Sequence, residues 1–401
     1  MTADPRSIVR RQGLPKSNSR PVVTPLYPSV VYHSIDADEL DAQYEGRIQG
    51  YTYAREGHPN AAVLGEKIDW LEGVTAEMGK GVVTSSGMGA VATLFLGLLK
   101  AGDHIVAGDQ LYGRSLRLLT QDLPRLGFQT TLADPTDANA FVRAIRPDTK
   151  MLLVEVVSNP TLRVADMEEI ARMAGERGLM LAVDNTFTTP RAYRPFTQGA
   201  DVVIHSITKL LAGHSDVTLG WIAANSPKRN LALYNAAVTW GLTSSPFDCW
   251  LAERGLHTFE LRFDRAQASA AALAEALDGM EGVEKVLYPG RADHPDHQRA
   301  MALLGGKGAN MVSFRLAGGR AEVNAFLRAA ENIVFAPTLG DVGTTLSHPA
   351  SSSHRGLTPE DRVALGITEG FIRISVGCED PDQLIREIAA AVAATRHARA
   401  G

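Results

Sequence analysis

The sequence predicts an α/β protein with a mostly parallel sheet and a smaller C-terminal α+β domain. The chain has 401 residues, which is more than one hydrophobic core usually serves. Between residues 61 and 258, short apolar runs alternate with segments of helical period. From residue 259 a long helical pattern is followed by mixed strands and helices. We therefore expect an N-terminal arm (1–60), a sheet domain (61–258) and a C-terminal domain (259–401).

The N-terminal arm contains several prolines, glycines and arginines and shows little periodicity. Its segment PVVTPLYPSVVYH (21–33) is too apolar to stay solvated as a disordered tail. We expect this arm to pack on something else, such as another subunit. Its first twenty residues lack the apolar stretch of a secretory signal.

The sheet domain is expected to alternate between strands and helices. Strands are predicted at 80–86, 104–109, 150–159, 179–185 and 201–205. Helices are predicted at 87–102, 137–146 and 166–178, the last with acidic residues in its first turn and a glycine at its end. Continuous apolar strands between helices indicate a mostly parallel sheet covered on both faces.

The C-terminal domain is expected to begin with a long helix and to continue as a smaller α+β unit. The helix covers 263–280. Strands are predicted at 283–290, 310–316 and 371–377, and further helices at 320–331 and 381–398.

Composition excludes several classes of protein. A net charge of −5 argues against nucleic acid or an anionic membrane as the main partner. No apolar run approaches the roughly 20 residues of a membrane span. The two cysteines, Cys249 and Cys378, form neither a zinc-binding spacing nor a disulfide framework, so no metal site is expected and a reducing cytoplasm fits best. Cys249 stands next to Trp250 and is expected to be a buried small hydrophobe.

Polar residues follow the predicted parallel strands, where open parallel sheets bind their ligands. The strand at 150–159 ends in Ser158 and Asn159. The next two strands are followed by Asp184, Asn185 and Thr186, and by Ser206, Thr208 and Lys209. The first strand ends in Ser85, Ser86 and a glycine-rich turn that opens a helix. One crevice is therefore expected to hold an acid, an amide, several hydroxyls, a helix N-terminus and one lysine.

This set of side chains matches the needs of pyridoxal phosphate. The cofactor requires a lysine for a Schiff base, here Lys209, and a carboxylate against its pyridine nitrogen, here Asp184. Its phosphate requires backbone N–H groups and hydroxyls at a helix start. The candidates for the phosphate site are Gly87, Met88, Ser206 and Thr208.

A dinucleotide-binding oxidoreductase is the rival interpretation. The stretch SSGMGAVA satisfies the relaxed fingerprint G-x-G-x-x-G/A with Gly87, Gly89 and Ala92. Asp109 follows at the end of the next predicted strand, where a ribose-binding acid would lie. This alternative leaves Lys209 without a role.

Ordered motifs make the sequence resemble the pyridoxal-phosphate enzymes of cysteine and methionine metabolism, a branch of the aspartate-aminotransferase-like fold (fold type I). The resemblance runs from about Tyr51 to the C-terminus. The motifs that carry it are Tyr53-Ala-Arg55, Ser86-Gly87-Met88, Tyr112-Gly113, Ser158-Asn159-Pro160-Thr161, Asp184-Asn185-Thr186, Ser206-x-Thr208-Lys209 and IRISVGCED. The resemblance implies a seven-stranded sheet.

The resemblance also implies roles for individual residues. The cofactor would be held by Tyr53, Arg55, Gly87, Met88, Tyr112, Asn159, Asp184, Thr186, Ser206, Thr208 and Lys209. Catalysis would fall to Lys209, Tyr112 and Tyr53, and substrate binding to Arg373, Thr338 and Asn159. In relatives, Tyr53 and Arg55 reach the phosphate of a neighbouring subunit. The resemblance therefore implies a homotetramer built from dimers that share active sites.

Within the family, the segment 338–354 resembles that of methionine γ-lyases. This likeness favours γ-elimination on methionine, homocysteine or cystathionine, which yields 2-oxobutyrate, ammonia and a thiol. Arg114 departs from the cysteine of methionine γ-lyases. Gly343 replaces a glutamate of many relatives, whose loss would favour a side chain smaller or less polar than that of cystathionine. The alternatives are a γ-replacing transferase, such as a cystathionine γ-synthase or an O-acetylhomoserine sulfhydrylase, and an inactive scaffold.

Overall fold

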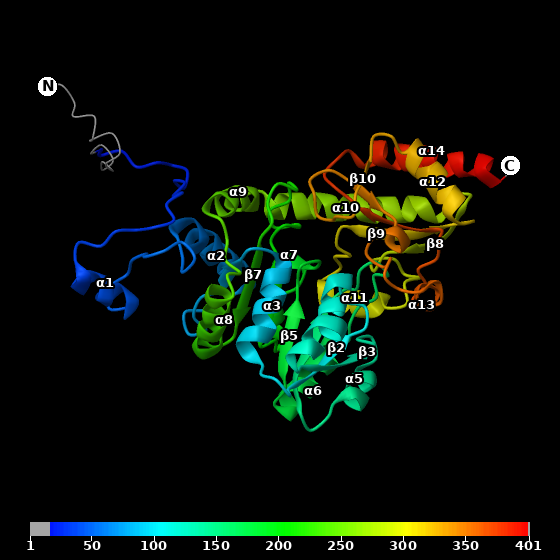
Figure 1. Cartoon of the computed structure of the whole chain (residues 1–401). Helices are drawn as coiled ribbons and strands as arrows, with labels where there is room; N and C mark the ends of the chain where they lie inside the picture. The colour runs from blue at the N-terminus through cyan, green and yellow to red at the C-terminus, as the bar shows by residue number, and fades with distance from the viewer. Residues whose placement is uncertain (1–16, 400–401) are drawn as a thin grey trace.

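The computed structural model describes residues 17–399 and contains two sheets with separate hydrophobic cores (Figure 1). Predictions for the first 16 residues lie outside the described part. Helix α10 (Phe259–Asp278) joins the two cores: Phe259 and Phe263 pack in the first, and Ala270 and Leu273 in the second. Among residues 17–399, no helix combines the length and hydropathy needed to cross a membrane.

The first sheet has seven strands in the order β1-β7-β6-β5-β4-β2-β3. Their bounds are Val82–Thr84, His104–Gly108, Gln129–Ala133, Thr149–Glu155, Met180–Asp184, Val202–Ser206 and Gly220–Ala224 for β1 to β7. Strands β2 to β6 pair in parallel, whereas β7 is antiparallel to both β6 and β1. The carboxyl ends of β4, β5 and β6 therefore lie side by side.

Helices cover both faces of this sheet. One face packs against α3 (Gly87–Leu98) and α8 (Pro227–Thr239). The opposite face packs against α2 (Pro59–Glu72), α5 (Ala138–Ala144), α6 (Met167–Arg177) and α9 (Pro246–Leu256). Shorter helices, α4 (Gly113–Arg117) and α7 (Thr189–Ala192), follow strand ends.

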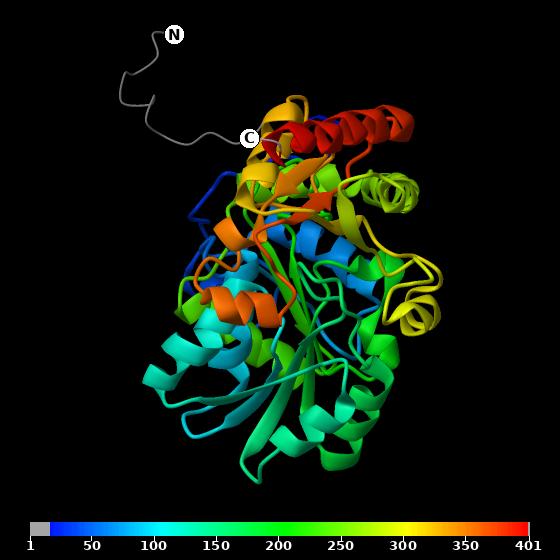
Figure 2. The same ribbon diagram turned by 90° about the vertical axis from the view of Figure 1, so that its right-hand side faces the viewer.

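The second sheet has five strands in the order β10-β11-β12-β9-β8, and its domain lies over one end of the first sheet (Figure 2). The bounds of β8 to β12 are Val283–Leu287, Met311–Leu316, Val334–Phe335, Thr345–Ser347 and Phe371–Ser375. Helices α10, α12 (Arg320–Ala329) and α14 (Pro381–Arg399) contribute to its core or lie against it. The remaining helices are α11 (His297–Leu304) and α13 (Pro359–Ala364).

Several elements were not predicted from periodicity. Strand β3 is a partly exposed edge strand, and β7 follows β6 without a helix, which is why it runs antiparallel. Inside the arm, α1 (Ala37–Tyr44) begins where the Asp36 side chain accepts the N–H of Glu39 at 2.9 Å. Helix α10 begins four residues before the predicted start at 263.

The part of the arm that contains α1 extends away from the two sheets (Figure 1). It is tied down at its base, where the Tyr27 N–H donates to Asn60 Oδ1 at 2.9 Å and Trp250 Nε1 donates to the Thr24 carbonyl at 2.9 Å. Beyond this point many apolar side chains are exposed, namely Val30, Val31, Ile35, Tyr44, Ile48 and Tyr53. So many exposed large apolar side chains in one segment are typical of an interaction surface.

Candidate active site

A cavity of about 250 Å³ lies where the carboxyl ends of β4, β5 and β6 meet the domain of the second sheet. It is lined by all but two of the residues predicted to bind the cofactor or the substrate: Gly87, Met88, Tyr112, Asn159, Asp184, Thr186, Ser206, Thr208, Lys209, Thr338 and Arg373. Ser85, Ser158 and Asn185, which were also expected in this crevice, do not line it. Residues up to 287 positions apart in the sequence, from Ser86 to Arg373, thus face one space.

Tyr53 and Arg55 are the two predicted residues outside this cavity. The Tyr53 ring is 40% exposed, and the Arg55 guanidinium lies over it, 5.4 Å from the ring centroid. Arg55 also lies 3.7 Å from the Glu56 carboxylate. Within one chain, therefore, neither side chain lines the cavity that holds Lys209.

Lys209 lies in the turn after β6, and its side chain is partly buried. Its Nζ donates to Thr338 Oγ1 at 3.3 Å, a contact from the first sheet to the second domain. Burial, and then the charge of Arg373, lower the pKa of the Lys209 amine. An amine with a lowered pKa is more often neutral and is therefore a better nucleophile and base.

Asp184 ends β5 and receives hydrogen bonds that favour its charged form. Burial raises the pKa of Asp184, while hydrogen bonds from the Thr186 side chain and N–H, and the charge of His205, act in the opposite direction. Thr186 Oγ1 also accepts the N–H of Ser206 at 2.8 Å, which ties the end of β5 to the end of β6.

The turn between β1 and α3 brings backbone N–H groups to the cavity. Ser86 caps α3 by accepting the Gly89 N–H at 2.9 Å. A Cβ atom on Gly87 would lie 2.6 Å from the Ser206 Cβ, so only glycine fits beside Ser206. The helix start and the Ser206 hydroxyl therefore form one cradle suited to an anion.

Arg373 is a buried cation on β12 that points into the cavity. Its Nη1 donates to Asn159 Oδ1 at 2.8 Å and its Nη2 donates to the Thr338 carbonyl at 2.5 Å. Burial lowers the pKa of Arg373 to about 10. Its Nε is buried and has no hydrogen-bond partner among residues 17–399. Arg373, which is 5% exposed, is therefore an interior residue.

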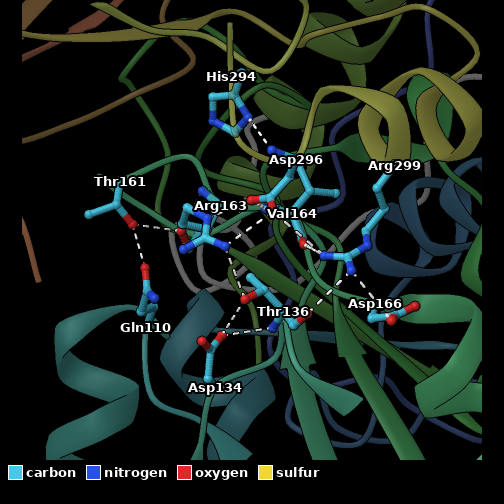
Figure 3. A network of polar contacts seen from close by, with 11 residues as sticks. Gln110, Asp134, Thr136, Thr161, Arg163, Val164, Asp166, His294, Asp296 and Arg299 are labelled. Atoms are coloured by element: carbon cyan, nitrogen blue, oxygen red, sulfur yellow. Dashed lines mark hydrogen bonds and ion pairs between the residues drawn. The ribbon is translucent and has the colours of Figure 1, made fainter. Parts of the chain in front are cut away.

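A polar network holds Thr161, Arg163 and Val164, which follow Asn159 in the chain, against residues of other elements (Figure 3). Arg163 forms a two-pronged ion pair with Asp296, with distances of 2.6 and 3.1 Å, and Asp296 also accepts the Val164 N–H at 3.0 Å. Arg299 donates to the Val164 carbonyl at 2.9 Å. Because Asp296 and Arg299 belong to the β8–β9 connection, the network joins the two domains beside the cavity.

Sequence reasoning missed several residues that line the cavity, most notably Glu155. The others are Val91, Ser115, Phe187, Thr218, Pro337, Leu339, Ser352 and Ser353, whereas Ser86, expected at the glycine turn, lines the cavity as predicted. Glu155 is the last residue of β4, but the apolar pair Val156-Val157 after it hides the end of the strand in the sequence. Its charge within an apolar run was the signal that could have identified it.

Two residues singled out in the sequence do not line the cavity. The first is Gly343, where the atoms nearest to a Cβ would be carboxylate oxygens of Asp341 and Glu379. The preference for a smaller substrate inferred from Gly343 stays a prediction. Asp109, the candidate ribose ligand, is also absent from the cavity, and the charges of Asp134 and Arg163 act on its carboxylate. Cys249 is fully buried as expected, and burial raises the pKa of its thiol to about 12.

The residues of the cavity fit pyridoxal phosphate. A glycine cradle for an anion, a carboxylate at a strand end and a lysine amine with a lowered pKa share one enclosed space with a buried arginine. Together with the parallel sheet and the smaller second domain, they define a pyridoxal-phosphate enzyme of fold type I.

Comparison with known proteins identifies the family. The family model for Cys/Met metabolism PLP-dependent enzymes matches residues 7–393, and the chain belongs to this family. The chain is 38% identical to cystathionine β-lyase MetC of Bacillus subtilis (strain 168) over 366 residues, covering 90% of this chain and 89% of the relative. It is 35% identical to L-methionine γ-lyase of Porphyromonas gingivalis (strain ATCC BAA-308 / W83), covering 92% and 91%.

The solved structures agree with this assignment. The crystal structure of cystathionine γ-synthase from Xanthomonas oryzae pv. oryzae, in complex with aminoacrylate and cysteine, superposes with a TM-score of 0.88 at 35% identity and covers 94% of each chain. The predicted fold class and the predicted cofactor are thereby confirmed. The dinucleotide-binding alternative is excluded, since the glycine turn belongs to a pyridoxal-phosphate enzyme. The relatives include both lyases and synthases.

Proposed function

We propose that this enzyme removes a sulfur leaving group from Cγ of an amino acid and releases 2-oxobutyrate, ammonia and a thiol. The observation that carries the proposal is the contact between Lys209 Nζ and Thr338 Oγ1, 3.3 Å apart, in a cavity that also holds Asp184 and Arg373. Bound pyridoxal phosphate supplies an electron sink for the bonds of the substrate's Cα. The protein must bind, orient and exchange protons with the substrate.

The cofactor would be held by the residues of the first sheet and its loops. Asp184 would keep a proton on the pyridine nitrogen, and Asn159 would donate to the phenolic oxygen. The N–H groups of Gly87 and Met88, with the hydroxyls of Ser206 and Thr208, would hold the phosphate. Thr186 supports Asp184 and Ser206 through the hydrogen bonds described above, and the ring of Tyr112 would stack on the cofactor.

The substrate would be fixed through its α-carboxylate by Arg373. A planar guanidinium suits a carboxylate, and Asn159 and Thr338 already hold two of its nitrogens in place. Lys209 would then take the proton from Cα at Nζ, and Tyr112 would serve as a second acid–base group near the leaving sulfur. Both proton transfers need an enclosed site, which the second domain provides.

Tyr53 and Arg55 would complete the site of a neighbouring subunit. Their position outside the cavity of their own chain and the exposed apolar side chains of the arm support this assignment. We propose dimers that share active sites and pair into a homotetramer. We further place the enzyme in the cytoplasm, where Cys249 and Cys378 remain free thiols.

The proposal is tested by a product assay with methionine, homocysteine and cystathionine, each supplied without an added thiol. We expect 2-oxobutyrate from at least one of them. Lys209→Ala should lower the rate by roughly 10²–10⁴-fold or more, the usual effect of losing an acid–base group. Lys228→Ala, an exposed lysine on α8, is the matched control. Formation of 2-oxobutyrate by Lys209→Ala at the wild-type rate would refute the proposal.

A γ-replacing transferase is the second candidate, because a groove beside the cavity suits the cystathionine that such an enzyme would form. A groove of about 810 Å³ opens beside Tyr112 and shares Pro337, Ser352 and Ser353 with the main cavity. Its lining contains the three arginines Arg114, Arg117 and Arg355, and none of the described residues that line it is acidic. His354 adds no charge at neutral pH, because burial, together with Arg373 and Arg362, lowers its pKa to about 4. Such a groove suits a substrate with a second carboxylate, such as cystathionine or the cysteine that would form it.

Feeding an activated homoserine ester with cysteine separates the two candidates. A transferase forms a new thioether, whereas a lyase forms 2-oxobutyrate whether or not cysteine is present. Arg114→Ala should raise the KM for cystathionine by about 10-fold and leave that for methionine unchanged. Arg125→Ala, an exposed residue outside the groove, is the control. Equal effects of Arg114→Ala on both substrates would show that the groove does not select a second carboxylate.

A further inference from the structure

Glu155 is a buried acid in the active site to which the proposed function gives no role. It ends β4 and lines the cavity. It also pairs in register with Asp184 on the adjacent parallel strand. Because side chains at paired positions of neighbouring strands point to the same face, the two carboxyl groups lie next to each other. Neither of them makes an ion pair with a described residue.

Asp184 receives more hydrogen bonds that stabilise a negative charge than Glu155 does. Asp184 receives the Thr186 N–H at 3.0 Å and a hydrogen bond from the Thr186 side chain, and it feels the charge of His205. Glu155 has one donor, the Tyr112 N–H, at 2.7 Å from Oε1. Burial, and then the charge of Asp184, raise the pKa of Glu155 well above its ordinary value. When two such carboxyls share a site, the proton stays on the one with fewer donors.

A hydrogen bond connects Glu155 to Tyr112, which also lines the cavity. Tyr112 lies between β2 and α4 and is 43% exposed, and its backbone is held by two hydrogen bonds, from its N–H to Glu155 Oε1 at 2.7 Å and from the Leu116 N–H to its carbonyl at 3.0 Å. Because Oε1 of Glu155 accepts the Tyr112 N–H, Oε2 is left to carry the proton. The other ionisable groups that line the cavity are Tyr112, Lys209 and Arg373, and His205 acts on Asp184 from β6.

We propose that Glu155 is a positioning residue that remains a neutral carboxylic acid. It anchors the Tyr112 backbone through one oxygen and leaves Asp184 as the only carboxylate that faces the ring nitrogen of the cofactor. The single negative charge of Asp184 then balances the single positive charge on the pyridine ring. The inference depends on the cofactor and is independent of which sulfur amino acid is the substrate.

Infrared difference spectroscopy of the holoenzyme tests the protonation state. The spectrum of Glu155→Gln, subtracted from that of the wild type at pH 7, should contain the C=O band of a protonated carboxyl group. Glu168→Gln, which changes an exposed glutamate on α6, should instead remove a carboxylate band and is the matched control. A carboxylate band in the Glu155→Gln difference spectrum would overturn the proposal.

The dissociation constant of the cofactor, measured by equilibrium dialysis of the holoenzyme, tests the positioning role. Glutamine keeps an oxygen for the Tyr112 N–H and is neutral, whereas leucine removes the acceptor. Leaving this N–H unpaired should make the dissociation constant of Glu155→Leu roughly 10-fold larger than that of Glu155→Gln. Equal weakening by both substitutions would mean that a charged Glu155 is required, and no weakening by either would mean that it positions nothing. If Glu155→Leu does not fold, the infrared measurement on Glu155→Gln still decides.

Discussion

Arg262 on α10 holds the chain just after Lys209, and its replacement should destabilise the protein strongly. The side chain is 7% exposed and donates to three carbonyls: Leu210 at 2.8 Å, Leu211 at 3.0 Å and Gly255 at 2.9 Å. Arg262→Met keeps the aliphatic stem but leaves these carbonyls without their donor. At about 1–3 kcal/mol for each unpaired buried group, less the gain from no longer burying a charge, we expect a loss of about 3–5 kcal/mol.

Urea denaturation of the holoenzyme, followed by tryptophan fluorescence, measures this loss as a shift of the midpoint. Arg265→Met, on the same helix, removes an exposed arginine with one hydrogen bond, to the Glu379 carbonyl at 3.1 Å, and should cost less than about 0.5 kcal/mol. Because Leu210 follows Lys209 directly, Arg262→Met should also lower the cofactor content. If Arg262→Met were no more destabilising than Arg265→Met, the guanidinium would not be holding this turn.

A double-mutant cycle with Gly213 makes the test specific. A Cβ on Gly213 would lie 1.8 Å from Arg262 Nη1, and the residue has a φ of +74°. Gly213→Ala must therefore displace the guanidinium in the wild type. In the Arg262→Met background only the backbone strain should remain, about 1–2 kcal/mol. Strict additivity of the two substitutions would show that the clash does not exist.

Three further predictions concern the domain network, the buried histidines and the arm. Burial opposes the ionisation of Asp296, but the hydrogen bonds from Arg163 and Val164 bring its pKa below the ordinary 3.8. Asp296→Asn should therefore lower the free energy of unfolding, measured by urea denaturation, by about 2–3 kcal/mol at pH 7, and this difference should shrink only below about pH 4. Equal urea midpoints for the variant and the wild type at pH 7 would contradict this prediction. Burial lowers the pKa of His294 and His354 from 6.5 to about 4, so folding favours their neutral forms. The free energy of unfolding should therefore fall from pH 6.5 towards pH 4, and it should fall less steeply in a variant that carries both His294→Asn and His354→Asn. Parallel pH profiles for the variant and the wild type would refute this prediction. Mixing inactive Arg55→Ala subunits with inactive Lys209→Ala subunits should restore part of the activity, because a hybrid dimer can assemble one intact site, whereas no recovery would contradict shared sites.

The strand ends were predictable because parallel strands place their carboxyl ends at one edge. Asp184, Ser206 and Lys209 follow apolar runs in the sequence, and that order alone brings them together. Glu155 was missed because Val156 and Val157 continue the apolar run after the strand has ended. Gly343 lies in a segment that reaches the cavity through Thr338, but the glycine itself does not line the cavity. Proximity in sequence predicts proximity in space only while the chain remains in one element.

The division of the site between two sheets has a consequence for specificity. The groups assigned to the cofactor within one chain come from the first sheet and its loops, between Gly87 and Lys209, whereas Thr338 and Arg373, assigned to the substrate, come from the second domain. Asn159 lies at the junction, because it contacts Arg373 and its loop is fixed by Asp296 of the second domain. Substitutions in the second domain or in the groove around Arg114 can therefore change the substrate without disturbing the cofactor. The relatives of 35–38% identity over nearly the whole chain include both a β-lyase and a γ-lyase. Under the proposed assignment, we expect the residues around Thr338 and Arg114, rather than those around Lys209, to decide which sulfur amino acid this enzyme accepts.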